Sequence, residues 1–129
     1  MHLRLTRSLV PLLAGAFFAT AALAVGAPFS RTAFDATQQA GKPVLVAIHA
    51  DWCGTCRAQE PVIEALLKSP KYAGFTVYRV DFDRQKDAVR RFGVQYQSTL
   101  IVFKGAREVS RSTAQTAPGA IAAQLDKAL

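Results

Sequence analysis

A strongly apolar run that leads directly into two closely spaced cysteines constrains the fold of this chain more than any other feature. Residues 44–49 are mostly apolar and rich in β-branched side chains, which predicts a central strand buried on both faces. Trp52-Cys53-Gly54-Thr55-Cys56 follows at once, and it holds the only two cysteines of the sequence. At the start of a helix, this spacing brings both sulfur atoms onto one face within bonding distance.

The cysteine pair predicts thiol–disulfide exchange. The unpaired N–H groups and the positive dipole end of a helix stabilise a thiolate at Cys53, and the thiolate is the species that attacks disulfides. A purely structural disulfide is the alternative. Closing so short a loop constrains the unfolded chain by only about 2 kcal/mol, which makes redox activity the better interpretation.

Metal and haem sites are rival uses of the same cysteines. A closed zinc site needs four ligands, whereas the chain without its leader offers two cysteines and His49. Covalent haem attachment requires a histidine directly after the second cysteine, where Arg57 stands. Cys53, Cys56 and His49 can supply a soft three-ligand site for Cu(I), so a copper-binding chaperone is the alternative function.

Residues 1–24 have the pattern of a signal peptide and predict an exported, periplasmic protein. Arg4 and Arg7 form a positive start, residues 9–22 are almost wholly apolar, and Ala22-Leu23-Ala24 provides the small residues for cleavage after its last alanine. The alternative is a retained N-terminal membrane anchor, because the apolar stretch is about long enough to span a bilayer.

Beyond the leader, we predict a linker over residues 25–31 and one domain over residues 32–129. Without the two arginines of the leader, 14 Lys and Arg residues face 9 Asp and Glu residues, which lowers the net charge from +7 to +5. Those charges are scattered, and only Arg90-Arg91 are adjacent, so no nucleic-acid partner is predicted. No pattern predicts a dimer, and we expect a monomer.

Hydrophobic periodicity predicts helices and strands that alternate along this domain. Helices are expected over residues 32–40, 57–68 and 84–92 and from Pro118 onward, and strands over residues 44–49, 75–80, 100–103 and 109–112. The last two strands form a hairpin, and Pro61 is expected to kink the second helix. The fold class is therefore α/β, with a four-stranded mixed sheet flanked by helices.

Several short segments resemble the thioredoxin family. Lys42-Pro43-Val44-Leu45-Val46 before Ala50-Asp51-Trp52-Cys53 is similar to exported thioredoxin-like proteins and to the periplasmic thiol domain of the membrane reductant transporter. Pro61 stands eight residues after the first cysteine, and Gly93-Val94 followed by Thr99 resembles the family's cis-proline region. The resemblance covers residues 32–129 and implies a thioredoxin-like fold.

The resemblance also implies roles for individual residues. Cys53 would be the exposed nucleophile, Cys56 would resolve the mixed disulfide, and Trp52 would pack beside the sulfurs and shape the docking surface. Protein disulfides are the implied substrates. No NADPH, flavin or other cofactor is expected, so electrons would come from another thiol protein, for which a membrane reductant transporter is a candidate.

Ser98 departs from the family, because it stands where the cis-proline precedes Thr99. A cis bond before a non-proline residue costs about 2.5–4 kcal/mol, so we expect a trans peptide. Ser98 also adds a backbone N–H and a hydroxyl that we expect to face the cysteines. In the family, the proline loop pairs with the substrate backbone and helps to keep metals off the thiols. We expect Ser98 to alter both functions.

The strand before the cysteines departs too. Ala47 occupies the place of the family's buried aspartate, His49 lies on the same strand face nearer the site, and Arg79 stands at the family's buried lysine. His49 is either a packed histidine or a proton acceptor, and Glu60, one helical turn after Cys56, is either a competing acceptor or a solvated charge. We expect the head of Arg79 to turn outward.

Gly54 and Thr55 separate the cysteines without adding charge. Strongly oxidising members of the family place a histidine here, whose positive charge favours the thiolate. We therefore expect Cys53 to be moderately acidified and the disulfide to be moderately reducing.

Overall fold

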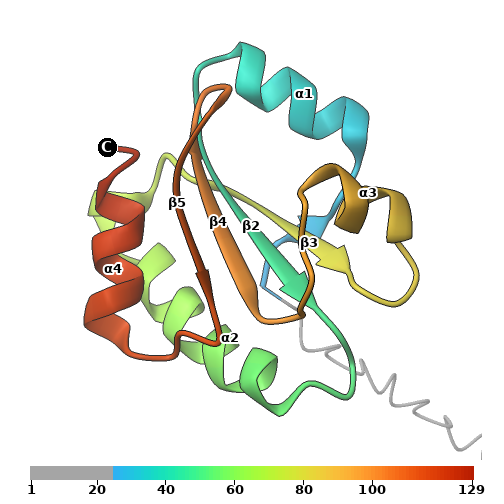
Figure 1. The fold of residues 1–129 in the computed structure, drawn as a ribbon. Coiled ribbons are helices and arrows are strands. Elements are labelled where there is room, and N and C mark those ends of the chain that lie inside the picture. Colours follow the sequence, from blue (N-terminus) through green and yellow to red (C-terminus); the bar gives the residue numbers. More distant parts are fainter. Residues whose placement is uncertain (1–24) are drawn as a thin grey trace, which may run out of the picture.

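The computed structural model describes residues 25–129, so the expected leader over residues 1–24 lies outside the described residues. Within residues 25–129, five strands form one mixed sheet in the order β1-β3-β2-β4-β5 (Figure 1). The strands are β1 (Ala27–Pro28), β2 (Pro43–His49), β3 (Thr76–Asp81), β4 (Thr99–Lys104) and β5 (Arg107–Thr113). The helices are α1 (Arg31–Gln39), α2 (Gly54–Leu67), α3 (Lys86–Arg91) and α4 (Pro118–Asp126), with a short 3-10 turn, η1 (Pro70–Tyr72), after α2.

The sheet confirms the expected mixed α/β architecture. β2 lies at its centre, parallel to β3 and antiparallel to β4, with Ala47 opposite Arg79 on one side and Leu100 on the other. β4 and β5 form the expected hairpin. Its tight turn contains Gly105 at φ 57, in the left-handed region that favours glycine.

The segment 25–31 belongs to the domain and is not the linker that we expected. Ala27 and Pro28 add a fifth, edge strand parallel to β3. Phe29 is buried, and its ring centroid lies 5.5 Å from that of Phe34 and 5.3 Å from that of Phe92. A two-residue strand has no periodicity to detect, which explains why the sequence pattern does not reveal it.

The two faces of the sheet carry separate cores, because side chains alternate along β2. Val44, Val46 and Ile48 pack toward α1 and α3, whereas Leu45 and Ala47 pack toward α2 and α4. Figure 1 shows α1 and α3 on one side of the sheet and α2 and α4 on the other.

Helix α2 begins at Gly54, shortly after β2 ends at His49, and the cysteine motif lies at its N-terminus. It runs without a break through Pro61, whose missing N–H leaves one carbonyl of the preceding turn without its helical donor. Its buried stripe consists of Cys56, Gln59 and Ile63. No helix within residues 25–129 combines the length and the apolar character needed to cross a membrane.

Candidate active site

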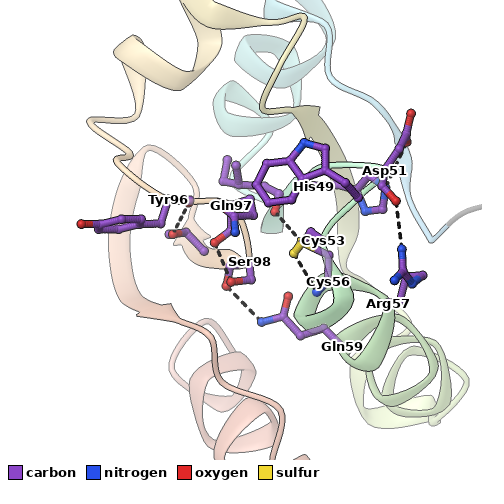
Figure 2. The surroundings of a disulfide bond; sticks show 12 residues. His49, Asp51, Cys53, Cys56, Arg57, Gln59, Tyr96, Gln97 and Ser98 are labelled. Carbon is purple, nitrogen blue, oxygen red and sulfur yellow. Dashed lines mark hydrogen bonds and ion pairs between the residues drawn. A yellow bond between two sulfur atoms is a disulfide. The ribbon is translucent and has the colours of Figure 1, made fainter.

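The cysteine pair forms the N-terminus of α2. Cys53 is the N-cap residue, and its Sγ accepts a hydrogen bond from the backbone N–H of Cys56 at 3.0 Å. Cys53 and Cys56 are joined by a disulfide with a Cα–Cα distance of 5.3 Å (Figure 2). The helix start therefore presents a backbone donor to the sulfur on which negative charge develops when the disulfide is reduced.

Both cysteines are buried in this disulfide form. Cys53 and Cys56 are each only 3% exposed, and they cluster with Ala50, against which Phe82 also packs. The expectation of an exposed Cys53 is therefore wrong for the oxidised protein, because the strand-to-helix turn folds the sulfur against this small apolar cluster. A reacting thiol has to approach through the residues that surround it.

Two exposed aromatic side chains lie on the segments that flank the disulfide. Trp52 is 59% exposed, and its indole N–H donates to Asp83 Oδ2 at 2.8 Å. Tyr96 is 63% exposed, and Figure 2 shows it turned away from the sulfurs while Gln97 and Ser98 lie beside them. Exposed rings of this size are typical of contact surfaces for other proteins.

The two residues between the cysteines add no charge to this surface. Gly54 opens α2 at the surface, and a Cβ built there would meet only the Arg57 guanidinium at 3.9 Å. Thr55 is half-buried. Arg57 itself donates to the Asp51 carbonyl at 3.0 Å, which fixes the turn that leads into the helix.

Ser98 has a trans peptide bond, as expected, since residues 25–129 contain no cis peptide. It is 4% exposed and lies in the left-handed region at φ 60. Its N–H donates to the Ile48 carbonyl at 2.8 Å, and its hydroxyl donates to the Gln97 carbonyl, so the hydroxyl is engaged within its own loop. Thr99 braces the same loop, because its buried hydroxyl bonds to the Tyr96 carbonyl at 2.8 Å.

Gln59 is a site residue that the sequence reasoning missed. It is 3% exposed, and its side-chain amide donates to the carbonyls of Ser98 at 3.0 Å and Gln115 at 2.9 Å. It thereby ties α2 to the loop beside the disulfide. Its place on the buried stripe of the helix, between Cys56 and Ile63, was the available signal.

His49 lies between two carboxylates. Its Nδ1 is 3.4 Å from Glu60 Oε1, and its Nε2 is 3.4 Å from Asp51 Oδ1. The imidazole side chain is 13% exposed, the Glu60 side chain 33% and the Asp51 side chain 73%. His49 therefore lies against α2, beside Glu60 and near Cys56.

The three residues considered as copper ligands, Cys53, Cys56 and His49, have other partners in this disulfide form. Within residues 25–129, no group of three His, Cys, Asp or Glu side chains is arranged to hold a metal ion. Both nitrogens of His49 are turned toward carboxylates, and the two sulfurs are bonded to each other.

A cavity of about 20 Å³ lies behind Cys56. Its polar lining comes from His49, Gln59, Glu60 and Arg79, and its apolar lining comes from Val25, Ala47, Ile48 and Ile63. Arg79 also lines a surface pocket, which it shares with Asp51, Asp81 and Arg84. Its half-buried side chain therefore borders both the cavity and this pocket. A volume of this size is enough for about one water molecule.

Asp81, at the end of β3, is a titratable group next to this region whose pKa is shifted. Burial alone would raise its pKa, but hydrogen bonds from the Arg84 backbone and guanidinium and from the Asp83 N–H outweigh burial and lower the pKa below its ordinary value of 3.8. Asp81 is therefore ionised near neutral pH and holds Arg84 beside Asp51.

Comparison with known proteins gives one consistent family. The family model described as Thioredoxin matches residues 26–127. A thioredoxin of Chlamydia muridarum is 42% identical over 69 residues, which cover 54% of this chain and 66% of that protein. Protein disulfide-isomerase tigA of Aspergillus niger is 42% identical over 73 residues, which cover 55% of this chain and 20% of that protein. The chain thus spans no more than two thirds of the length of these two curated relatives.

Solved structures agree with that assignment. The crystal structure of Trxlp from Edwardsiella tarda EIB202 is similar with a TM-score of 0.74 and 42% identity, covering 76% of this chain and 95% of that one. Thioredoxin NaTrxh from Nicotiana alata is similar with a TM-score of 0.66 and 30% identity, covering 74% of this chain and 81% of that one.

Proposed function

Because this chain belongs to the thioredoxin family, we propose that it is an exported thiol–disulfide oxidoreductase that reduces or exchanges disulfides of other proteins. The observation that carries this proposal is the position of Cys53 at the N-cap of α2. There its sulfur accepts a hydrogen bond from the backbone N–H of Cys56, and this bond favours the thiolate over the thiol.

The reaction follows from that position. In the reduced protein, the Cys53 thiolate attacks one sulfur of a partner disulfide, forms a mixed disulfide and expels the other partner sulfur as a thiolate, which takes up a proton. Cys56 then loses its proton and attacks Cys53 Sγ, which releases the second partner thiol. The partner gains two electrons and two protons, and the Cys53–Cys56 pair becomes the disulfide of this structure.

The surroundings of the disulfide suit a protein substrate. Trp52 and Tyr96 supply exposed aromatic area on the segments that flank a buried sulfur. The relative from Aspergillus niger is named as a protein disulfide-isomerase, which agrees with this substrate class. Electrons for another round of reduction come from a second thiol protein, and a membrane reductant transporter is our candidate for that donor.

We expect the pair to be moderately reducing, since neither Gly54 nor Thr55 adds a positive charge beside Cys53. The reduction potential can be measured by equilibration with glutathione, using the fluorescence of Trp52, the only tryptophan. A potential near that of strong periplasmic oxidants, about −120 mV, would contradict this expectation.

Trapping of partners tests the proposed activity. Cys56→Ser keeps the attacking sulfur and removes the resolving one, so we expect covalent mixed disulfides that disappear on treatment with a reductant. Cys53→Ser is the matched control, and it should form none. Equal adducts from both variants, or none from either, would sink the proposal.

Export is a separate part of the proposal, supported by the pattern of residues 1–24. Full-length protein produced in a Gram-negative host should accumulate in the periplasm with the mass of a chain that begins at Val25. A chain of full mass in the membrane fraction would instead identify the leader as an anchor. We expect the mature protein to elute as a monomer in size-exclusion chromatography.

A further inference from the structure

The proposed reaction leaves the proton of Cys56 without an evident destination. Cys56 is 3% exposed, and its Sγ lies 3.7 Å from the Ile48 carbonyl oxygen, which can accept a hydrogen bond but cannot retain a proton. Ala47 has no group that can take the proton either. A thiol that is to attack Cys53 must nevertheless become a thiolate.

The cavity behind Cys56 connects this sulfur to ionisable groups. Cys56, His49 and Glu60 all line the same volume of about 20 Å³. Because this volume is sufficient for about one water molecule, a proton can pass from the thiol to the Glu60 carboxylate over a single bridge. Glu60 is four residues after Cys56 on α2, so the helix itself fixes the two side chains on one face.

The imidazole of His49 can hold the proton that Cys56 releases. A neutral imidazole donates from one nitrogen only, so with Glu60 at Nδ1 and Asp51 at Nε2 one carboxylate always faces an unprotonated nitrogen. One added proton converts the ring to a cation, which both carboxylates attract. The cluster can therefore hold one more proton beside the two carboxylates.

The other charged groups around His49 are compatible with this role. Arg79 and Asp81 come from β3, and Arg84 reaches Asp51 from the loop that follows β3. Arg79 also lines the cavity, where its positive charge favours a thiolate at Cys56 over a thiol.

We propose that Glu60, paired with His49 and Asp51, accepts the proton of Cys56 when this cysteine resolves the mixed disulfide. This inference rests on the proposed thiol–disulfide exchange. The proton leaves Cys56 Sγ for the Glu60 carboxylate and the imidazole, the Cys56–Cys53 bond forms, and the bond from Cys53 to the partner sulfur breaks. The electron pair leaves with the partner thiolate.

The two half-reactions can be separated with Ellman's disulfide, dithiobis(nitrobenzoate), as the partner. Attack by Cys53 releases the first coloured thiolate at a rate that depends on reagent concentration. Resolution by Cys56 releases the second in a step that does not. The reduced protein is mixed with limiting reagent at a series of pH values from about 6 to about 9.5, which span the ordinary thiol pKa of about 8.5.

We expect Glu60→Gln and His49→Gln to slow the second release about 10-fold or more near pH 6.5 and to leave the first release unchanged. The difference from the unmodified protein should vanish at the alkaline end, where solvent removes the proton from Cys56. Glu64→Gln is the matched control. Glu64 lies on the same helix but pairs with Lys68 at the surface, so its loss should change neither phase.

A merely structural role would slow the second release by the same factor at every pH, and that result would overturn the inference. So would an unchanged second phase in Glu60→Gln, whatever His49→Gln does, or an equal effect of Glu64→Gln. An unmodified protein that fails to release the first thiolate would instead refute the proposed function itself. Circular dichroism confirms that each variant is folded.

Discussion

The two faces of the five-stranded sheet carry cores of different composition. On the face that packs against α1 and α3, rings dominate, and the centroids of Phe34, Tyr78, Phe92 and Phe103 lie 5.4–6.0 Å from at least one neighbouring ring. The face that packs against α2 and α4 is mainly aliphatic and also buries Gln59 and Gln124. It contains the cavity behind Cys56 as well.

The difference shows that stability and chemistry are divided between the faces. Tilted and edge-on rings bury much apolar area in fixed geometry, which suits a core that need not move. Buried amides and a water-sized space weaken packing, but they hold the loop at Ser98 and give protons a route from Cys56. Alternate side chains of β2 pack into both cores. The aromatic core therefore fixes the strand that leads to the active site on the other face.

Truncation of the aromatic core is expected to have the largest effect. Phe34→Ala removes a side chain that is 1% exposed, and we expect it to lower the free energy of unfolding by about 3–5 kcal/mol. Urea unfolding followed by Trp52 fluorescence measures this. If the faces are independent, both phases of the Ellman reaction keep their rates under native conditions. A slowed second phase would contradict this independence.

Loss of a buried amide on the other face is expected to have an intermediate effect on stability and a specific effect on exchange. Gln59→Leu leaves the Gln115 carbonyl without its donor and releases the loop at Ser98, and we expect a loss of about 1–3 kcal/mol. Trapping of partners should slow as the loop loosens.

Gln124→Leu is the matched control for that variant. Gln124 is 8% exposed on the same face and exchanges hydrogen bonds with Ser110 and Ser112, away from the disulfide. It should lose a similar amount of stability in urea without any change in trapping. Equal effects of the two variants on trapping would show that general loosening of this face, rather than the loop, controls exchange.

Removal of the Asp81 carboxylate is expected to have the smallest effect, and one that depends on pH. The pKa of Asp81 is lowered in the folded protein, chiefly by Arg84 against the opposing effect of burial. Its contribution is therefore present above pH 3.8 and is lost as pH falls through the lower folded pKa. Asp81→Asn should be less stable by about 1 kcal/mol or less at neutral pH.

Acid unfolding of the two proteins checks the sign of this effect. The difference in the free energy of unfolding should be constant near neutral pH and should shrink below about pH 3.8. A difference that grows with acidity would mean that the pKa is raised instead.

Most of the fold followed from local patterns in the sequence. The run before the cysteines is buried, the four longer strands and four helices lie close to their expected residues, and Ala47 and His49 share a face because strand side chains alternate. β1 and the burial of Phe29 could not be predicted, since two residues carry no period and their partner, β3, is about fifty residues away.

The site was predictable only in part. The spacing of Cys53 and Cys56 identified the disulfide, and the trans peptide at Ser98 followed from the energy of a cis bond. The burial of Cys53 and the hydrogen bonds of Gln59 depend on loops that pack from elsewhere in the chain. Sequence distance gives no measure of such contacts.

The sequence by itself determined the chemistry, because two cysteines at the start of a helix can reach each other whatever surrounds them. Only the tertiary structure decided their environment. It placed β2, α2 and β3 so that Cys56, Glu60 and Arg79 border one small cavity, with the sulfurs out of solvent. The physical reason is that bond formation within one helical turn is local, whereas burial and the path of a proton are set by side chains that meet only when distant segments pack together.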